Sequence, residues 1–172
     1  MNIKSIIVSK LEQFNNSEKF NNIYSNKNFN GKNEEAKFVL NFIEVKSFRT
    51  DNTIDFSNSS VEHIYPQNPD NNVYNNDNML EDINNTYLLG NMTLFEQNND
   101  SDGNSGNSSL SNNSNFVEKK EAFGKSRYNI TREIETKYPE HSFLDSKINE
   151  RHIYLRDKLW EIINEYQIYY CF

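Results

Sequence analysis

A glutamate followed directly by a histidine, Glu62-His63, is the pair of side chains in this sequence best suited to chemistry. A neutral imidazole can take a proton from water near pH 7, and a carboxylate can hold a hard divalent cation. Hydrolysis of a phosphodiester needs both functions, because water must be activated and charge on the phosphate oxygens must be stabilised. The dipeptide alone is common, so an ordinary, partly buried histidine is the competing interpretation.

Amide side chains supply a second group of candidates. Asn91 follows Gly90 inside an apolar run, where a glycine is typical of a bulge or a close backbone approach. An amide oxygen can orient an imidazole or bind a hard cation. The alternative is that Asn91 only forms a turn. Residues 97–115 are almost wholly Asn, Ser, Asp and Gly, and they lead into the next apolar segment.

The elements that must position these residues are mainly helical. Apolar residues at helical spacing predict helices within 3–14, 36–45, 115–123, 126–138 and 148–166. Extended chain is predicted before His63, where Pro66 stops it, and on both sides of Gly90-Asn91. A strand ending in Glu-His, a loop, a strand with Gly-Asn and an Asn-rich helix entry is the layout of a ββα-metal nuclease site.

The sequence therefore predicts an α+β fold that is mainly α, a helical domain with an embedded ββα-metal hairpin and helix. Its 172 residues suit one domain. We expect residues 25–172 to form this domain. Residues 1–24 are expected to form an N-terminal helix or the end of a preceding domain.

Charge is distributed unevenly along the chain. The net charge of −7 argues against a protein that binds any nucleic acid through charge alone. Residues 51–102 contain acidic side chains and no Lys or Arg, which suits a divalent cation. Basic residues return at 119–137 and are placed to face a phosphate backbone. A solvated helix face is the alternative.

Cys171 is the one cysteine, so neither a disulfide framework nor a multi-cysteine zinc site fits within one chain. Nothing in the sequence resembles a signal peptide, and no apolar run approaches the length of a membrane span. We expect a cytoplasmic protein with no membrane partner.

Several short motifs occur in a defined order. They are Glu-His-Ile-Tyr-Pro-Gln at 62–67, Gly-Asn-Met-Thr-Leu at 90–94, an Asn/Ser-rich turn at 107–112, Phe-Val-Glu-Lys-Lys at 116–120, Phe-Gly-Lys-Ser at 123–126 and Ile-Asn-Glu-Arg at 148–151, before Trp160. In this order they resemble the C-terminal HNH domain of GmrSD-type restriction enzymes. The resemblance covers roughly residues 25–165.

The resemblance implies a DNA endonuclease or nickase that depends on Mg2+ or Mn2+ and cleaves double-stranded DNA. It also implies a role in defence against foreign or modified DNA. A ParB-like nucleotide-hydrolysing domain, N-terminal or separate, is the implied partner. By position, Glu62 corresponds to a metal ligand, His63 to the general base, and Asn91 to the asparagine that positions the base or supports the site.

The helix-side metal ligand is the least certain position by motif, because residues 99–106 form an insert. Asn107 matches it best by spacing, with Asn98 and Asn99 as alternatives, and Asn112 is assigned a supporting role. Asn107 and Asn112 can equally be helix caps. Four basic residues are candidates for contacts with DNA phosphates, with solvent-facing positions as the alternative. They are Lys119, Lys120, Lys125 and Arg127.

Three other groups receive structural interpretations. Arg151 is expected to form an internal ion pair, His152 to be a core histidine, and His141 lies outside the motif. The competing function is a catalytically inactive interaction or regulatory module, favoured by the long Asn/Ser insert. An RNase is a third possibility.

Overall fold

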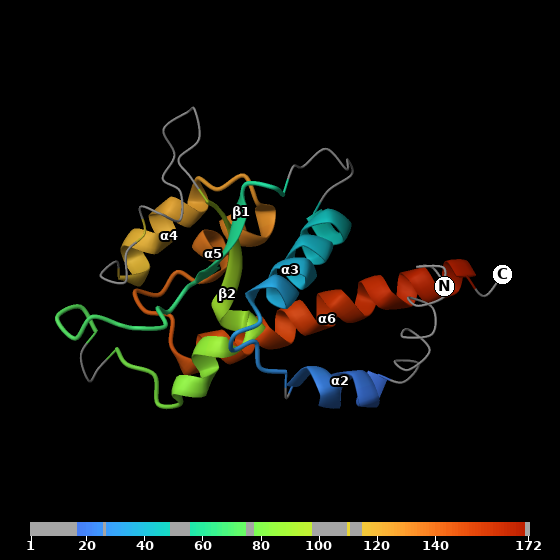
Figure 1. Ribbon diagram of the computed structural model, residues 1–172, viewed down its shortest axis with the longest axis horizontal. Coiled ribbons are helices and arrows are strands. Elements are labelled where there is room, and N and C mark those ends of the chain that lie inside the picture. Colours follow the sequence, from blue (N-terminus) through green and yellow to red (C-terminus); the bar gives the residue numbers. More distant parts are fainter. Residues whose placement is uncertain are drawn as a thin grey trace.

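The computed structural model of the chain describes residues 17–25, 27–48, 56–74, 78–97, 110 and 115–170, the last five as backbone only. Its elements, in order, are α2 (Ser17–Ser25), α3 (Asn33–Phe48), β1 (Ser59–His63), the 3-10 turns η1 (Ile83–Tyr87) and η2 (Leu89–Asn91), β2 (Met92–Glu96), α4 (Phe116–Gly124), α5 (Asn129–Lys137) and α6 (Asp145–Tyr170). The fold is α+β and mainly helical, as predicted (Figure 1). The helix expected at 3–14 lies outside the described residues.

The two strands form a small antiparallel sheet. Ser59 of β1 faces Glu96 of β2, and His63 faces Met92. Every residue of β2 is buried, whereas β1 is only partly covered. In Figure 1 the strands lie between α3 and α4. Helices therefore enclose β2, while residues 60–62 in the middle of β1 are partly exposed and both of its end residues, Ser59 and His63, are buried.

One predicted strand is wrong. Residues 86–89 are not extended, because the chain there winds through η1 and η2. The Leu88 N–H donates to the Asn85 carbonyl and the Asn91 N–H donates to the Leu88 carbonyl, so these backbone groups are satisfied locally. The apolar side chains of residues 86–89 belong to a turn that is buried on several sides. Their apolar sequence pattern is therefore similar to that of a buried strand.

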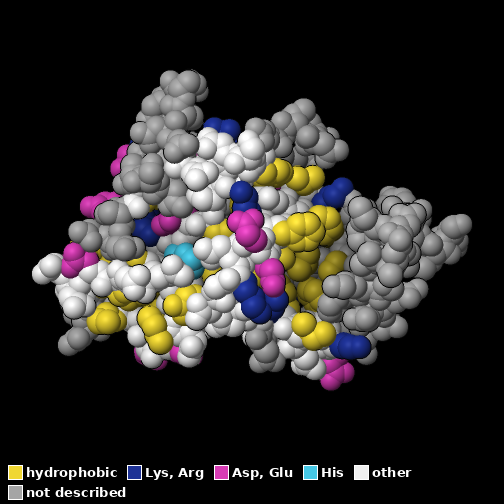
Figure 2. Space-filling view, in the orientation of Figure 1, with side chains coloured by type: hydrophobic (Ala, Val, Ile, Leu, Met, Phe, Trp, Pro, Cys, Tyr) yellow, Lys and Arg dark blue, Asp and Glu magenta, His cyan; other side chains and the backbone are white. Residues whose placement is uncertain are grey.

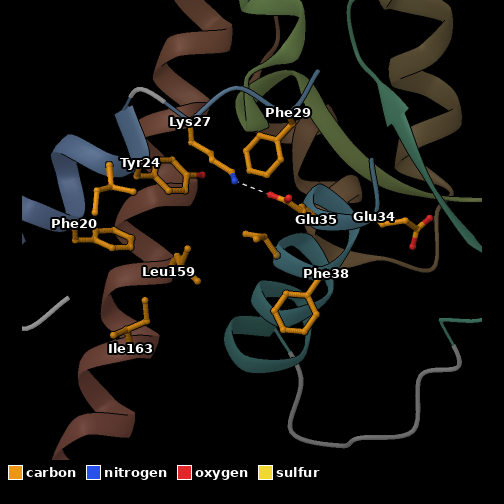
Figure 3. Close-up of a pocket in the computed structure, with 11 residues that line it drawn as sticks. Phe20, Tyr24, Lys27, Phe29, Glu34, Glu35, Phe38, Leu159 and Ile163 are labelled. Atoms are coloured by element: carbon orange, nitrogen blue, oxygen red, sulfur yellow. Dashed lines mark hydrogen bonds and ion pairs between the residues drawn. The ribbon is translucent and has the colours of Figure 1, made fainter. Parts of the chain in front are cut away.

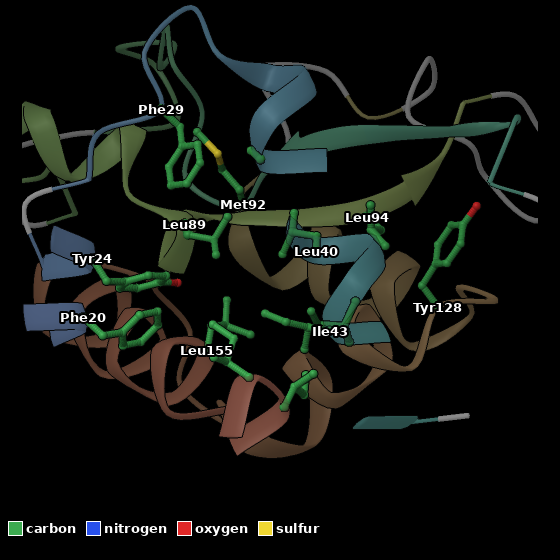
Figure 4. Packing of buried hydrophobic residues seen from close by; sticks show 14 residues of the cluster. Phe20, Tyr24, Phe29, Leu40, Ile43, Leu89, Met92, Leu94, Tyr128 and Leu155 are labelled. Carbon is green, nitrogen blue, oxygen red and sulfur yellow. The ribbon is translucent and has the colours of Figure 1, made fainter. Parts of the chain in front are cut away.

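The larger hydrophobic core joins the hairpin to four helices, α2, α3, α5 and α6 (Figure 4). Leu89 and Met92 come from η2 and β2, and they pack in one cluster with Leu40 of α3 and Leu155 of α6. Helix α2 adds aromatic rings, among them Phe20. A second buried cluster lies around α4, α5 and the start of α6.

Helix α6 crosses η2 at very short range. A Cβ on Gly90 would lie 2.0 Å from the Ile148 carbonyl oxygen and 2.6 Å from the His152 nitrogen. Arg151 is fully buried, and its guanidinium donates to the carbonyls of Gly90 at 3.0 Å and Met92 at 2.6 Å. Its position is internal, as expected, but its partners among the described residues are carbonyl oxygens and the Thr93 hydroxyl, so hydrogen bonds stand there in place of the predicted ion pair.

Polar side chains also fix the ends of helices. Glu44 of α3 is buried and accepts hydrogen bonds from the backbone N–H groups of Asn129 and Ile130 at the start of α5. Helix α4 begins with a capping box, in which the Asn115 side chain accepts from the Glu118 N–H and the Glu118 carboxylate accepts from the Asn115 N–H. These contacts set where each helix begins.

His152 lies in the core, as predicted, with 5% of its surface exposed and its Nε2 3.3 Å from the Tyr24 carbonyl oxygen. Among the described helices, none has the length and apolar character needed to cross a membrane.

Candidate active site

Glu62 and His63 are the last two residues of β1. The chain turns immediately afterwards, where the Ile64 N–H donates to the Asn91 carbonyl at 2.8 Å. His63 is 8% exposed, and its Nε2 is buried without a hydrogen-bond partner among the described residues. Buried polar atoms are usually satisfied, so an unpartnered imidazole nitrogen marks a position of chemical interest.

Asn91 fixes the chain beyond His63. Its side chain is fully buried; Oδ1 accepts from the Tyr65 N–H at 2.7 Å, and Nδ2 donates to the carbonyls of Tyr65 and Thr86, both at 2.9 Å. These contacts are all with backbone groups. Asn91 is therefore well placed to support the segment that carries His63. It also ends the η2 turn, and a turn was the alternative interpretation of this residue from the sequence.

Lys119 lies in an unexpected place. It projects from α4, is 2% exposed, and donates to Glu62 Oε1 at 2.6 Å and to the His63 carbonyl at 2.7 Å. A lysine in this position is not available at the surface for a DNA phosphate. The signal that sequence reasoning missed is its spacing, because Phe116, Lys119 and Phe123 share one face of α4 and all three are buried.

The other three basic candidates lie on the same part of the fold. Lys120 donates to three carbonyls beyond the end of α5, those of residues 138–140. Lys125 pairs with Glu121 at 2.9 Å, and Arg127 lies 3.4 Å from Glu96. Lys125 and Arg127 keep 58% and 39% of their side chains exposed, so they are the better placed for a phosphate.

Figure 2 shows one face of the molecule, on which basic and acidic side chains alternate over the described surface. This face carries no broad basic area among the residues that are coloured. Electrostatic attraction of DNA by this face is therefore local at most.

Burial and Lys119 together set the charge state of the pair. Burial, and to a smaller extent the charge of the Lys119 ammonium, together lower the pKa of His63 to about 4. The imidazole is therefore neutral at pH 7, but it is a weaker base than the ordinary histidine expected from the sequence. Burial raises the pKa of Glu62, while the charge and hydrogen bond of Lys119 oppose that rise.

The donor atoms present fit part of a site for a hard divalent cation. The Glu62 carboxylate is a suitable ligand, because oxygen donors suit Mg2+ or Mn2+, and the unpartnered Nε2 of His63 stays the candidate base. No group of three or more His, Cys, Asp or Glu that could hold a metal occurs in the part of the chain that the structure describes. The helix-side candidates Asn98, Asn99, Asn107 and Asn112 lie outside the described residues, so the remaining ligand stays a prediction.

A separate apolar pocket of about 570 Å3 lies between α2, α3 and α6 (Figure 3). Phe20 and Tyr24 of α2 face Leu159 of α6 across it, and an ion pair between Lys27 and Glu35, at 2.6 Å, lies at its edge. None of the predicted site residues is among its lining residues. Its lining does not offer groups for phosphodiester chemistry.

The family model described as "GmrSD restriction endonucleases, C-terminal domain" matches residues 14–158. The chain belongs to this family. The match includes both strands, η1, η2 and helices α2 to α5, and it confirms the resemblance carried by the motifs. No curated protein and no solved structure matches the chain. Membership of the GmrSD C-terminal family associates the domain with restriction endonucleases.

Proposed function

We propose that this GmrSD-family domain is an HNH-type DNA endonuclease or nickase that uses Mg2+ or Mn2+. The observation that carries the proposal is the buried, unpartnered Nε2 of His63, next to Glu62 at the end of β1. Membership of a restriction endonuclease family supports the same reaction class.

In the proposed reaction His63 accepts the proton of a water molecule. The water oxygen forms a bond to phosphorus, and the bond between phosphorus and the leaving ester oxygen breaks. A divalent cation, when bound, supplies positive charge that stabilises the phosphate and leaving oxygens. Glu62 and an asparagine from 98–112 would hold it. Asn91 keeps the segment after His63 in place through its contacts with Tyr65 and Thr86.

The low pKa of His63 has a consequence for this mechanism. At about 4 it guarantees a neutral imidazole at pH 7, but it also makes protonation unfavourable. An anionic phosphate beside the ring would counteract the effect of Lys119 and raise the pKa. We therefore propose that His63 becomes an effective base when DNA is bound.

The partner of the domain is proposed from the family resemblance, and the charge of the chain supports it. A chain with net charge −7 gains little attraction for DNA from its overall field. A ParB-like nucleotide-hydrolysing domain, in the same or a separate chain, would supply DNA affinity and control. The proposed biological role is defence against foreign or modified DNA.

A non-catalytic module is the second candidate. It is favoured by the contact between Lys119 and Glu62, which occupies one carboxylate oxygen with an ammonium, and by the low pKa of His63. The fold would then be retained for interaction with other parts of a defence protein.

Nicking of supercoiled plasmid with Mg2+, Mn2+ or EDTA tests the proposal. We expect metal-dependent nicking that His63→Ala abolishes and His141→Ala, a change at an exposed histidine, leaves intact. Equal nicking by the parent and His63→Ala would reject the assignment. Absence of both nicking and Mn2+ binding in a folded parent would favour the non-catalytic module, and a parallel assay on single-stranded RNA detects an RNase.

A further inference from the structure

Lys119 is the group that connects both residues of the candidate pair to α4. Its ammonium donates to the Glu62 carboxylate at 2.6 Å and to the His63 carbonyl at 2.7 Å. The lysine side chain is 3% exposed and the glutamate side chain 12% exposed, so solvent screens the pair only weakly. The side chains of neighbouring residues on a strand point to opposite faces of the sheet. Strand β1 alone therefore does not direct the side chains of Glu62 and His63 toward one site.

Stability alone does not explain a lysine in this position. Removing two charges from water is costly, and well-packed apolar residues of similar volume are often as stable as a buried ion pair, or more so. Lys119 has Phe116 and Phe123 on the same helix face, where a Met or Leu would extend an apolar surface that already exists. The contacts of the Lys119 ammonium with Glu62 and His63 explain a charged residue at this position better than fold stability does.

We propose that Lys119 is a positioning residue of the active site and that its ammonium also weakens the hold of Glu62 on a divalent cation. The inference rests on the proposed metal-dependent nuclease function. The two hydrogen bonds fix the Glu62 carboxylate and the His63 backbone relative to α4. The proposed metal ligand and the proposed base therefore keep one relative position. The fixed positive charge repels any cation that shares the same carboxylate, because like charges a few ångströms apart interact strongly at a weakly solvated site.

The test compares Lys119→Met with Lys147→Met in the full chain. Lys147 lies on α6 and pairs with Glu140 at 2.8 Å and Glu150 at 3.0 Å, away from the candidate site, so it is a matched control for loss of an ion-paired lysine. Mn2+ binding is measured by calorimetry and by the relaxation of water protons, nicking is measured on supercoiled plasmid, and folding is followed by circular dichroism. We expect Lys119→Met to bind Mn2+ at least about tenfold more tightly and to nick at least about tenfold more slowly. Lys147→Met should match the parent in both.

Tighter Mn2+ binding together with slower nicking distinguishes a positioning role from general structural support. A residue that only stabilised the fold would, on removal, weaken Mn2+ binding and nicking together. Folded Lys119→Met with parental or weaker Mn2+ affinity would therefore overturn the inference, as would parental nicking.

Lys119→Arg keeps the test decisive should Lys119→Met fail to fold. Arginine retains the charge but presents it on a planar fork, so Mn2+ affinity should stay within about threefold of the parent while nicking falls. Parental nicking by Lys119→Arg would overturn the inference. A folded parent that neither binds Mn2+ nor nicks rejects the proposed function and this inference with it, whereas an active parent with an unaltered Lys119→Met rejects the inference alone.

Discussion

At the scale of single residues, burial determines what each polar side chain can do. Glu62, His63 and Asn91 could be selected from the sequence because their motif is local. The contacts of Lys119 could not, because they join α4 to β1 across a large separation in the chain. The pKa of His63, at about 4, likewise depends on burial and on the Lys119 charge, neither of which the dipeptide reveals.

His152 predicts a pH dependence of stability. Burial lowers its pKa to about 4, although the contact with the Tyr24 carbonyl opposes this, while the unfolded side chain titrates near its ordinary value of 6.5. Between these values the unfolded state binds the proton and the folded state does not. The free energy of unfolding should therefore decrease as the pH falls from about 6.5 to about 4, by up to about 3 kcal/mol from this residue.

Urea denaturation at pH 7, 6 and 5 measures this effect. His152→Phe should reduce the dependence by about half, because phenylalanine cannot bind a proton and its ring retains packing against Tyr24, while His63, whose pKa is also lowered to about 4, keeps its own contribution. His141→Phe, at an exposed position, should leave the slope unchanged. An unaltered slope in His152→Phe would contradict the assignment.

Asn91→Asp should be strongly destabilising although the two side chains have the same shape. Asn91 Nδ2 donates to two carbonyls, and an aspartate oxygen at that position would face them without a proton to share. A loss of about 3 kcal/mol in unfolding free energy is expected, because the group is fully buried. Asn84→Asp, on an exposed side chain of η1, should change stability by less than about 1 kcal/mol. Similar losses in the two variants would argue against the buried network.

At the scale of elements, the predicted helices are confirmed where their apolar period is long. The patterns at 36–45 and 148–166 correspond to α3 (Asn33–Phe48) and α6 (Asp145–Tyr170). The strand expected at 86–89 fails because Leu88 and Leu89 are buried from several directions in η1 and η2, and such burial removes the alternation that distinguishes a strand from a turn. The long-range pairing of β1 with β2 followed from the motif, whereas the crossing of α6 over η2 had no local signal.

Gly90→Ala should disrupt this crossing. The added Cβ would meet backbone atoms of Ile148 and His152, which cannot move without displacing α6. We expect a loss of at least about 3 kcal/mol in unfolding free energy, or an insoluble protein. Gly124→Ala is the matched control, because there the Cβ meets the end of the flexible Glu135 side chain. Thermal melts of both variants provide the comparison, and equal melting temperatures would refute the argument.

At the scale of the whole molecule, charge predicts weak binding to DNA by the isolated chain, with a shallow dependence on salt concentration. Lys125 and Arg127 are the motif-derived cations that remain well exposed. Two phosphate contacts correspond to a slope of about −2 in log affinity against log salt concentration. Fluorescence anisotropy with duplex DNA at several KCl concentrations measures it, and the double variant Lys125→Glu, Arg127→Glu should abolish binding. A slope steeper than about −4 would reveal a larger basic surface than these residues provide.

The capping box at the start of α4 affects how the length of the preceding segment can change. Gln97 is held to Asn58 at the open end of the hairpin, and Asn115 and Glu118 close the start of α4 by themselves. Both ends of the intervening segment are thus anchored independently of its length. Insertions and deletions that spare the candidate ligands at 98, 99 and 107 can be explored there by evolution, or by protein engineering through loop grafting and tag insertion, while the contact between α4 and β1 is kept.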